Sequence, residues 1–105
     1  MRELSKKARD LFNAVSSGDT RKARQITRHH GNDPRVMNYV TTDKQATALM
    51  YAAKKGFTEI AGMLFNQLPV AHQIEAIHKA DTTGYTALII ATEMGHLDII
   101  TLLLN

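Results

Sequence analysis

Apolar side chains recur at helical spacing in the second half of this chain of 105 residues. Ile60, Met63 and Leu64 stand three and four positions apart, and the same apolar pattern returns 39 residues later as Ile99, Leu102 and Leu103. An apolar face with the spacing i, i+3, i+4 is typical of an amphipathic helix. The predicted helices span residues 58–67 and 97–104.

The similarity extends beyond these two helices. TALMYAAKKGFTEIAGMLF begins at Thr47 and TALIIATEMGHLDIITLLL begins at Thr86, and seven of the nineteen aligned positions are identical. Similarity at a fixed period is the sequence signature of a repeat protein. Two short helices cannot bury so much apolar surface by themselves, so the repeated units are expected to stack on one another.

Each copy also predicts a first helix that precedes the amphipathic one. The hydroxyl groups of Thr47 and Thr86 can accept a hydrogen bond from a backbone N–H and so cap a helix that begins at the next residue. Gly56 and Gly95 can adopt the left-handed conformation that ends a helix and reverses the chain. The predicted first helices span residues 48–55 and 87–94.

A weaker copy lies upstream in LFNAVSSGDTRKARQI, where a leucine again precedes a glycine by seven residues. It predicts a divergent helix pair within residues 5–30. The expected organisation is therefore a single domain over residues 1–105 with units at about 5–40, 41–79 and 80–105. Both connections are long, HHGNDPRVMNYV and QLPVAHQIEAIH, and the second is apolar enough to form a helical turn of its own, with Pro69 in its first turn.

The two clear copies resemble the ankyrin repeat, whose signature is T-P-L-H-x-A followed by a second helix of the type GHLDIV. DTTGYTAL resembles the β-turn finger that leads into the first helix, and GHLDII resembles the turn and the second helix. Ala48 and Ala87 stand where proline is usual. Met50 and Ile89 stand where histidine is usual, so the side-chain bond of that histidine is expected to be missing. The resemblance implies an all-α solenoid of stacked helix-turn-helix units with β-turn finger loops.

The resemblance also implies a function, because ankyrin domains generally bind proteins with the concave face formed by the fingers and the exposed side of the first helices. Tyr85 and Met94 are the strongest candidates, since interfaces favour aromatic and thioether side chains. For Lys44, Lys54 and Thr82 the alternative of plain solvent exposure remains open. Transferred position by position, the partner-binding residues would be Asp43, Lys44, Ala46, Lys54, Lys55, Thr82, Thr83, Tyr85, Glu93 and Met94.

Charge is distributed unevenly along the chain. Residues up to Arg35 include nine Lys or Arg against four Asp or Glu, and the remainder includes four against six. A basic stripe of Arg21, Arg24 and Arg28 could meet nucleic acid, an anionic lipid or an acidic protein. A terminal repeat needs a polar exterior, however, and no aromatic residue is interleaved with the arginines to stack bases. A solvated capping unit is therefore the preferred interpretation, and nucleic acid is not an expected partner.

The sequence shows no pattern of an enzyme, a metal site or a cofactor site. It has no cysteine, no glycine-rich phosphate loop and no nucleophile motif. His29 and His30 are adjacent and cannot act as metal ligands spaced i and i+4, so a role at the end of a helix is expected. No apolar run reaches the length of a membrane span and no signal-peptide core begins the chain, so a cytoplasmic protein is expected, with secretion into a host cell as the alternative for a bacterial effector.

The predicted last helix ends in LLLN without a polar capping unit, although repeat arrays need one. Continuation of the array or self-association through this helix is therefore expected. The sequence favours a non-catalytic module that binds a partner protein through its concave face. The alternatives are a targeting or scaffold segment of a larger enzyme or bacterial effector, and binding to an anionic surface through the basic N-terminal third.

Overall fold

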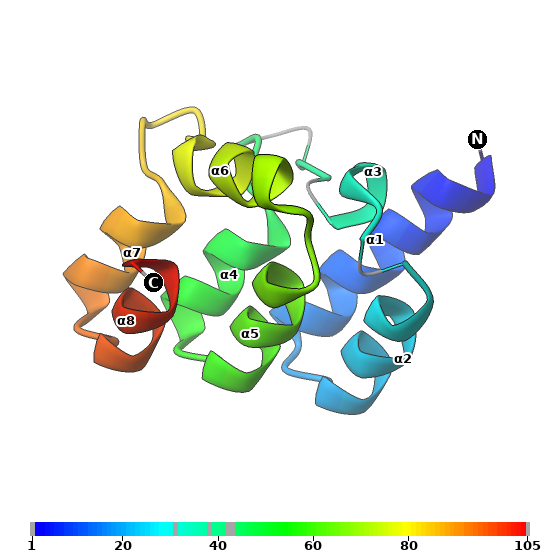
Figure 1. Cartoon of the computed structure of the whole chain (residues 1–105), viewed down its shortest axis with the longest axis horizontal. Helices are drawn as coiled ribbons and strands as arrows, with labels where there is room; N and C mark the ends of the chain where they lie inside the picture. Colours follow the sequence, from blue (N-terminus) through cyan, green and yellow to red (C-terminus); the bar gives the residue numbers. More distant parts are fainter. Residues whose placement is uncertain (1, 31, 38, 42–43, 105) are drawn as a thin grey trace.

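The computed structural model describes residues 2–30, 32–37, 39–41 and 44–104. Within these ranges the chain forms α-helices joined by turns, with isolated β-bridges as its only extended pairing (Figure 1). The helices are α1 (Arg2–Ser16), α2 (Thr20–His30), α3 (Pro34–Met37), α4 (Ala48–Lys55), α5 (Thr58–Asn66), α6 (Val70–His78), α7 (Ala87–Met94) and α8 (Leu97–Leu104).

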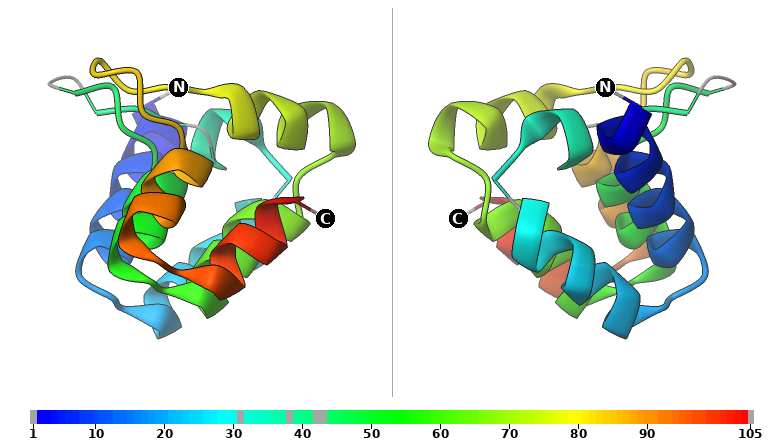
Figure 2. Two further views of the ribbon diagram at one scale, coloured as in Figure 1. Left: turned by 90° about the vertical axis from the view of Figure 1, so that its left-hand side faces the viewer. Right: turned by 90° about the vertical axis from the view of Figure 1, so that its right-hand side faces the viewer.

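Three helix pairs stack in chain order, α1 with α2, α4 with α5 and α7 with α8, and we refer to them as units 1, 2 and 3. The first helices form one layer and the second helices form another (Figure 2). In the first layer α4 packs against both α1 and α7, and in the second α5 packs against both α2 and α8. The predicted all-α solenoid and its helix pairs are confirmed.

The ends of the first helices follow the predicted chemistry. The Oγ1 atoms of Thr47 and Thr86 each accept a hydrogen bond, at 3.2 Å, from the backbone N–H three residues later. Gly56 and Gly95 end the helices in the left-handed conformation, with φ of 76° and 73°. Both predicted caps and both predicted turns are confirmed.

Met50 corrects one expectation drawn from the sequence. Its sulfur accepts a hydrogen bond from the backbone N–H of Thr47 at 3.5 Å, so the cap of α4 is reciprocal even though histidine is absent. A thioether is a weak acceptor, but here it satisfies a buried donor. Ile89 has no acceptor atom in its side chain, and the cap of α7 is therefore one-sided.

The predicted fingers precede α4 and α7. Antiparallel bridges join Val40 to Thr47 and Ala80 to Thr86, and each closes one finger. The two described fingers are also joined to each other, because the N–H of Thr82 donates to the carbonyl oxygen of Lys44 at 2.9 Å.

The residue that follows a turn glycine packs on the turn glycine of the preceding unit. A Cβ atom added to Gly18 would lie 3.1 Å from the ring of Phe57, and one added to Gly56 would lie 2.7 Å from the ring of His96. His96 also donates from Nε2 to the carbonyl of Lys54 at 3.2 Å. His96 follows the turn glycine in GHLDII, and this contact between units gives it a structural role.

The two long connections form helices of different character. In the second connection the predicted helical turn is α6, which Pro69 precedes directly, as its N-terminal cap position. Val70 and Ile74, which made this segment look apolar, are exposed, and Ala76 is the buried residue of the helix. The short α3 of the first connection packs against α1 and α2 and buries Val36 and Met37.

Candidate functional site

A groove lies between the finger of unit 3 and the adjacent first helices. One hollow of about 200 Å³ is lined by Lys54, Asp81, Thr83, Tyr85, Ile90, Glu93 and Met94. A smaller hollow of about 90 Å³ shares three of these residues and is further lined by Lys44, Ala46, Met50 and Tyr51. Because of the shared residues we treat the two hollows as one feature, the finger groove. The finger of unit 3, which borders this groove, protrudes beyond the layer of first helices (Figure 2).

Asp81 fixes the shape of the finger that borders the groove. Its Oδ1 atom accepts hydrogen bonds from Thr83 Oγ1 at 2.6 Å, Thr83 N at 2.9 Å and Tyr85 N at 3.0 Å. These bonds, that from the Thr83 hydroxyl above all, together with the positive charge of Lys44 hold the pKa of Asp81 below its usual value. The carboxylate therefore stays ionised near neutral pH and sets the position of Tyr85.

The apolar part of the finger groove comes from Tyr85, Ile90 and Met94. The residues Tyr85 and Met94 are 37% and 50% exposed. Ile90 and Met94 are four residues apart on α7, so they occupy the same face of that helix. Glu93, first through a side-chain hydrogen bond and second through its negative charge, raises the pKa of Tyr85.

The structure brings together most of the residues predicted from the family resemblance. Lys55 and Thr82 do not line the finger groove, and Thr82 contributes its backbone N–H to the bond between fingers. Ala46 lines the smaller hollow but is only 5% exposed, so it offers little surface to a partner. Asp43 lies outside the described residues. The predicted residues that do line the finger groove are Lys44, Ala46, Lys54, Thr83, Tyr85, Glu93 and Met94.

Four lining residues were not predicted from the sequence: Asp81, Ile90, Met50 and Tyr51. The spacing of four between Ile90 and Met94 was a usable signal, because it places both side chains on one face of the predicted helix. Asp81 had no comparable signal. Its contribution depends on three hydrogen bonds inside the finger that become visible only in the folded chain.

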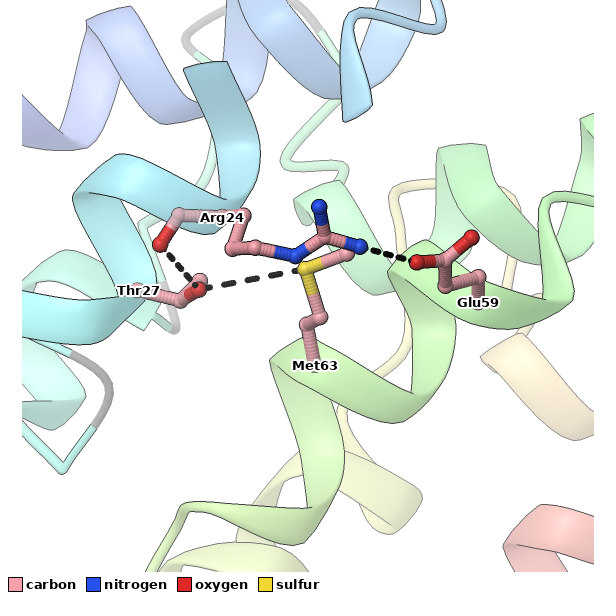
Figure 3. Close-up of polar contacts among 4 residues, drawn as sticks. All are labelled: Arg24, Thr27, Glu59 and Met63. Atoms are coloured by element: carbon pink, nitrogen blue, oxygen red, sulfur yellow. Dashed lines mark hydrogen bonds and ion pairs between the residues drawn. The ribbon is translucent and has the colours of Figure 1, made fainter. Parts of the chain in front are cut away.

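The basic stripe lies on α2, away from the finger groove. Arg24 forms an ion pair with Glu59 of unit 2, and next to it Thr27 Oγ1 donates to the Arg24 carbonyl at 3.2 Å and lies 4.0 Å from Met63 Sδ (Figure 3). Arg24 therefore links two units although its side chain is half exposed, and Arg21 and Arg28 are exposed as well. The preference for a capping role over nucleic-acid binding stays a prediction.

The described part of the chain holds no cluster of three or more His, Asp or Glu side chains that could bind a metal ion. His29 and His30 close α2, at the helix end where the sequence placed them. None of the described helices combines the length and apolarity that crossing a bilayer requires.

A family model described as ankyrin repeats in three copies matches residues 11–105. Searches of the curated proteins and of the solved structures returned no match. Ankyrin repeats are generally protein-protein interaction modules and are typically non-catalytic. The matched region contains unit 1 from Leu11 onward, units 2 and 3 and the finger groove, and the chain belongs to the ankyrin-repeat family.

Proposed function

We propose that this chain is a non-catalytic module that binds a partner protein in the finger groove. The observation that carries the proposal is the exposure of Tyr85 and Met94 in a hollow between the finger of unit 3 and the first helices. Exposed aromatic and thioether side chains that converge on a hollow are what protein interfaces use as anchors.

The size of the groove supports a protein partner over a small ligand. Pockets for small molecules usually enclose about 300–1,000 Å³, whereas the main hollow encloses about 200 Å³ and opens to one side. Such a hollow accommodates one or two side chains of an approaching polypeptide. Lys54, Asp81 and Glu93 line it with both signs of charge, so a partner with an apolar side chain flanked by polar or charged residues fits best.

The experiment compares the capture of proteins from cell extract by three forms of the chain. One is the unaltered chain, and the second carries Tyr85→Ala and Met94→Ala. The third is a matched control with Val70→Ala and Ile74→Ala, which removes exposed apolar side chains from α6, away from the finger groove. Circular dichroism and urea denaturation establish that all three are folded.

We expect the first and third forms to capture the same protein and the second to lose it. Titration with that purified protein should show a loss of more than about 1 kcal/mol for the groove variant, which is about a fivefold loss of affinity or more. Capture that survives in the groove variant and disappears in the α6 variant would place the binding surface on α6 and overturn the proposal.

A further inference from the structure

Units 2 and 3 offer a direct comparison, because each position of unit 3 lies 39 residues after its counterpart in unit 2. Met50 is 2% exposed and its counterpart Ile89 is 42% exposed. Phe65 is 5% exposed and its counterpart Leu104 is 67% exposed. These positions are apolar in both units. Within the described residues, a further unit and a connecting helix cover them in unit 2 and not in unit 3.

Ile100 and Gly95 show the same difference. Ile100 is partly buried, whereas its counterpart Ala61 is fully buried in unit 2. The ring of His96 fills the space over Gly56, whereas a Cβ atom added to Gly95 would meet no atom within 4 Å. The C-terminal end face, formed by Ile89, Ile100, Leu104 and the open space over Gly95, therefore reproduces in unit 3 the surface by which unit 2 meets unit 3.

The opposite end of the array is different, because its stacking positions are polar. Alignment of the turn glycines places Lys22 at the position of the buried Ile60 and Ile99. It also places Asp19 at the position of Phe57 and His96, the residues that pack on a preceding turn glycine. Lys22 and Asp19 are exposed, and Asp19 Oδ1 accepts from Lys22 N at 3.1 Å inside unit 1. Unit 1 thus has the polar outer face that a terminal unit requires, and unit 3 does not.

We propose that the C-terminal end face is a docking surface for a further helix-turn-helix unit of the same type, stacked on unit 3 as unit 3 is stacked on unit 2. The fit requires an aliphatic residue at the position of Ile99 and a flat ring at the position of His96, so that the ring covers Gly95. The inference is independent of the finger groove, which opens beside the fingers.

A second copy of this chain does not meet these requirements. If unit 1 of a second copy stacked on the C-terminal end face, its Lys22 would lie against Ile100 and Leu104. The charge of Lys22 would then lose its water without gaining an ionic partner. Unit 3 of a second copy, placed end face to end face, would present no ring to Gly95, because its own His96 already packs on Gly56. Stacking by either end of a second copy is therefore disfavoured, and a further unit remains as the occupant.

The test supplies that unit. Because Asn66 and Asn105 occupy equivalent positions, a second copy of residues 67–105 placed after Asn105 continues the repeat in register. Hydrogen exchange of the amides in α7 and α8 is compared between the original and the extended chain. We expect these amides to exchange more slowly in the extended chain, by about tenfold or more, because a stacked neighbour stabilises a repeat.

Three variants of the extended chain sharpen the result. Ile89→Lys with Leu104→Glu should abolish the added protection, and the same pair should leave the original chain folded because both side chains are exposed there. The counterpart of Ile99 in the added unit, changed to Lys as in unit 1, should also abolish it. Leu97→Lys is the control. Leu97 is exposed, and its counterpart Thr58 stays exposed in unit 2 even though unit 3 covers that unit, so an added unit should not cover Leu97. It should keep the protection.

Two outcomes would overturn the proposal. One is unchanged exchange in α7 and α8 of the extended chain. The other is sedimentation of the original chain as a dimer that Leu104→Glu dissociates, which would make a second copy the occupant.

Discussion

Units 2 and 3 have closely related sequences but bury different parts of them. In α4 five of eight residues are buried, whereas in α7 only Ala87 and Ala91 are. Both helices begin with the same Thr-Ala-Leu sequence and end at a left-handed glycine. The difference therefore comes from the neighbouring unit that covers α4, and burial in a repeat protein depends on the position of the unit as well as on its sequence.

Leu49 and Leu88 illustrate this dependence. They occupy equivalent positions of the repeated sequence, so the sequence alone leads us to expect that Leu88 is buried as a core leucine is. Leu49 is indeed buried at 4% exposure, but Leu88 is only partly buried against the core. The expectation of a fully buried Leu88 is therefore wrong, because no unit covers the far side of α7 in the described part of the chain.

The largest expected effect follows from this pair. Leu49→Ala should lower the free energy of unfolding by about 2 to 5 kcal/mol, as truncation of a buried leucine does, and Leu88→Ala should lower it by roughly 1 to 2 kcal/mol. Urea denaturation of the two variants side by side measures both values. Equal losses of unfolding free energy would contradict the expectation that Leu88, which no described unit covers, contributes less to stability than the covered Leu49.

A second pair concerns the turn glycines, where the expected effects are intermediate. Gly95→Ala should cost about 1 to 2 kcal/mol, because φ is positive at this position and an L residue resists it. Gly56→Ala should cost about 1 kcal/mol more, because the new methyl group displaces the His96 ring and breaks its hydrogen bond to Lys54.

Thermal or urea denaturation again provides the measurement for these glycines. Adding His96→Ala should narrow the gap between the two glycine variants, since it removes the clashing ring. A gap that persists in the His96→Ala background would show that the ring does not cause the additional cost.

The smallest effect is expected in the fingers. Gln45 and Gly84 are equivalent residues with positive φ, 53° and 86°. Gln45→Gly should stabilise the chain by about 0.5 kcal/mol, because relief of backbone strain exceeds the entropy that glycine adds to the unfolded chain. Gly84→Gln should destabilise it by about 1 kcal/mol through backbone strain alone, since a Cβ atom there would meet nothing within 4 Å. Shifts of the same sign in the urea midpoints would contradict this expectation.

Most of the fold could be predicted from the sequence because its signals are local. Thr47 and Gly56 mark the two ends of α4 by capping chemistry that depends on their immediate neighbours. The helix α3 had no such signal, because it is four residues long and its Val36 and Met37 are buried only where α1 and α2 meet. The sulfur bond of Met50 was also missed, since a thioether rarely serves as a cap.

The candidate site was less predictable because it combines residues from separate units. Tyr85 and Met94 could be selected by residue type and helix position. Residue type and helix position did not show that Lys55 and Thr82 lie outside the finger groove. The direction of a side chain at the end of a helix or in a finger depends on the folded backbone. Asp81 looked like an ordinary turn residue, although its carboxylate organises the finger that borders the groove.

The backbone bond between Thr82 and Lys44 has a consequence for how binding specificity could diversify. Because main-chain atoms join the two fingers, their spacing does not depend on which side chains the fingers present. Thr83, Tyr85 and Met94 could then be randomised in a library while the distance between the fingers stays constant. Variants selected for new partners would differ in the chemistry of the groove and share its width.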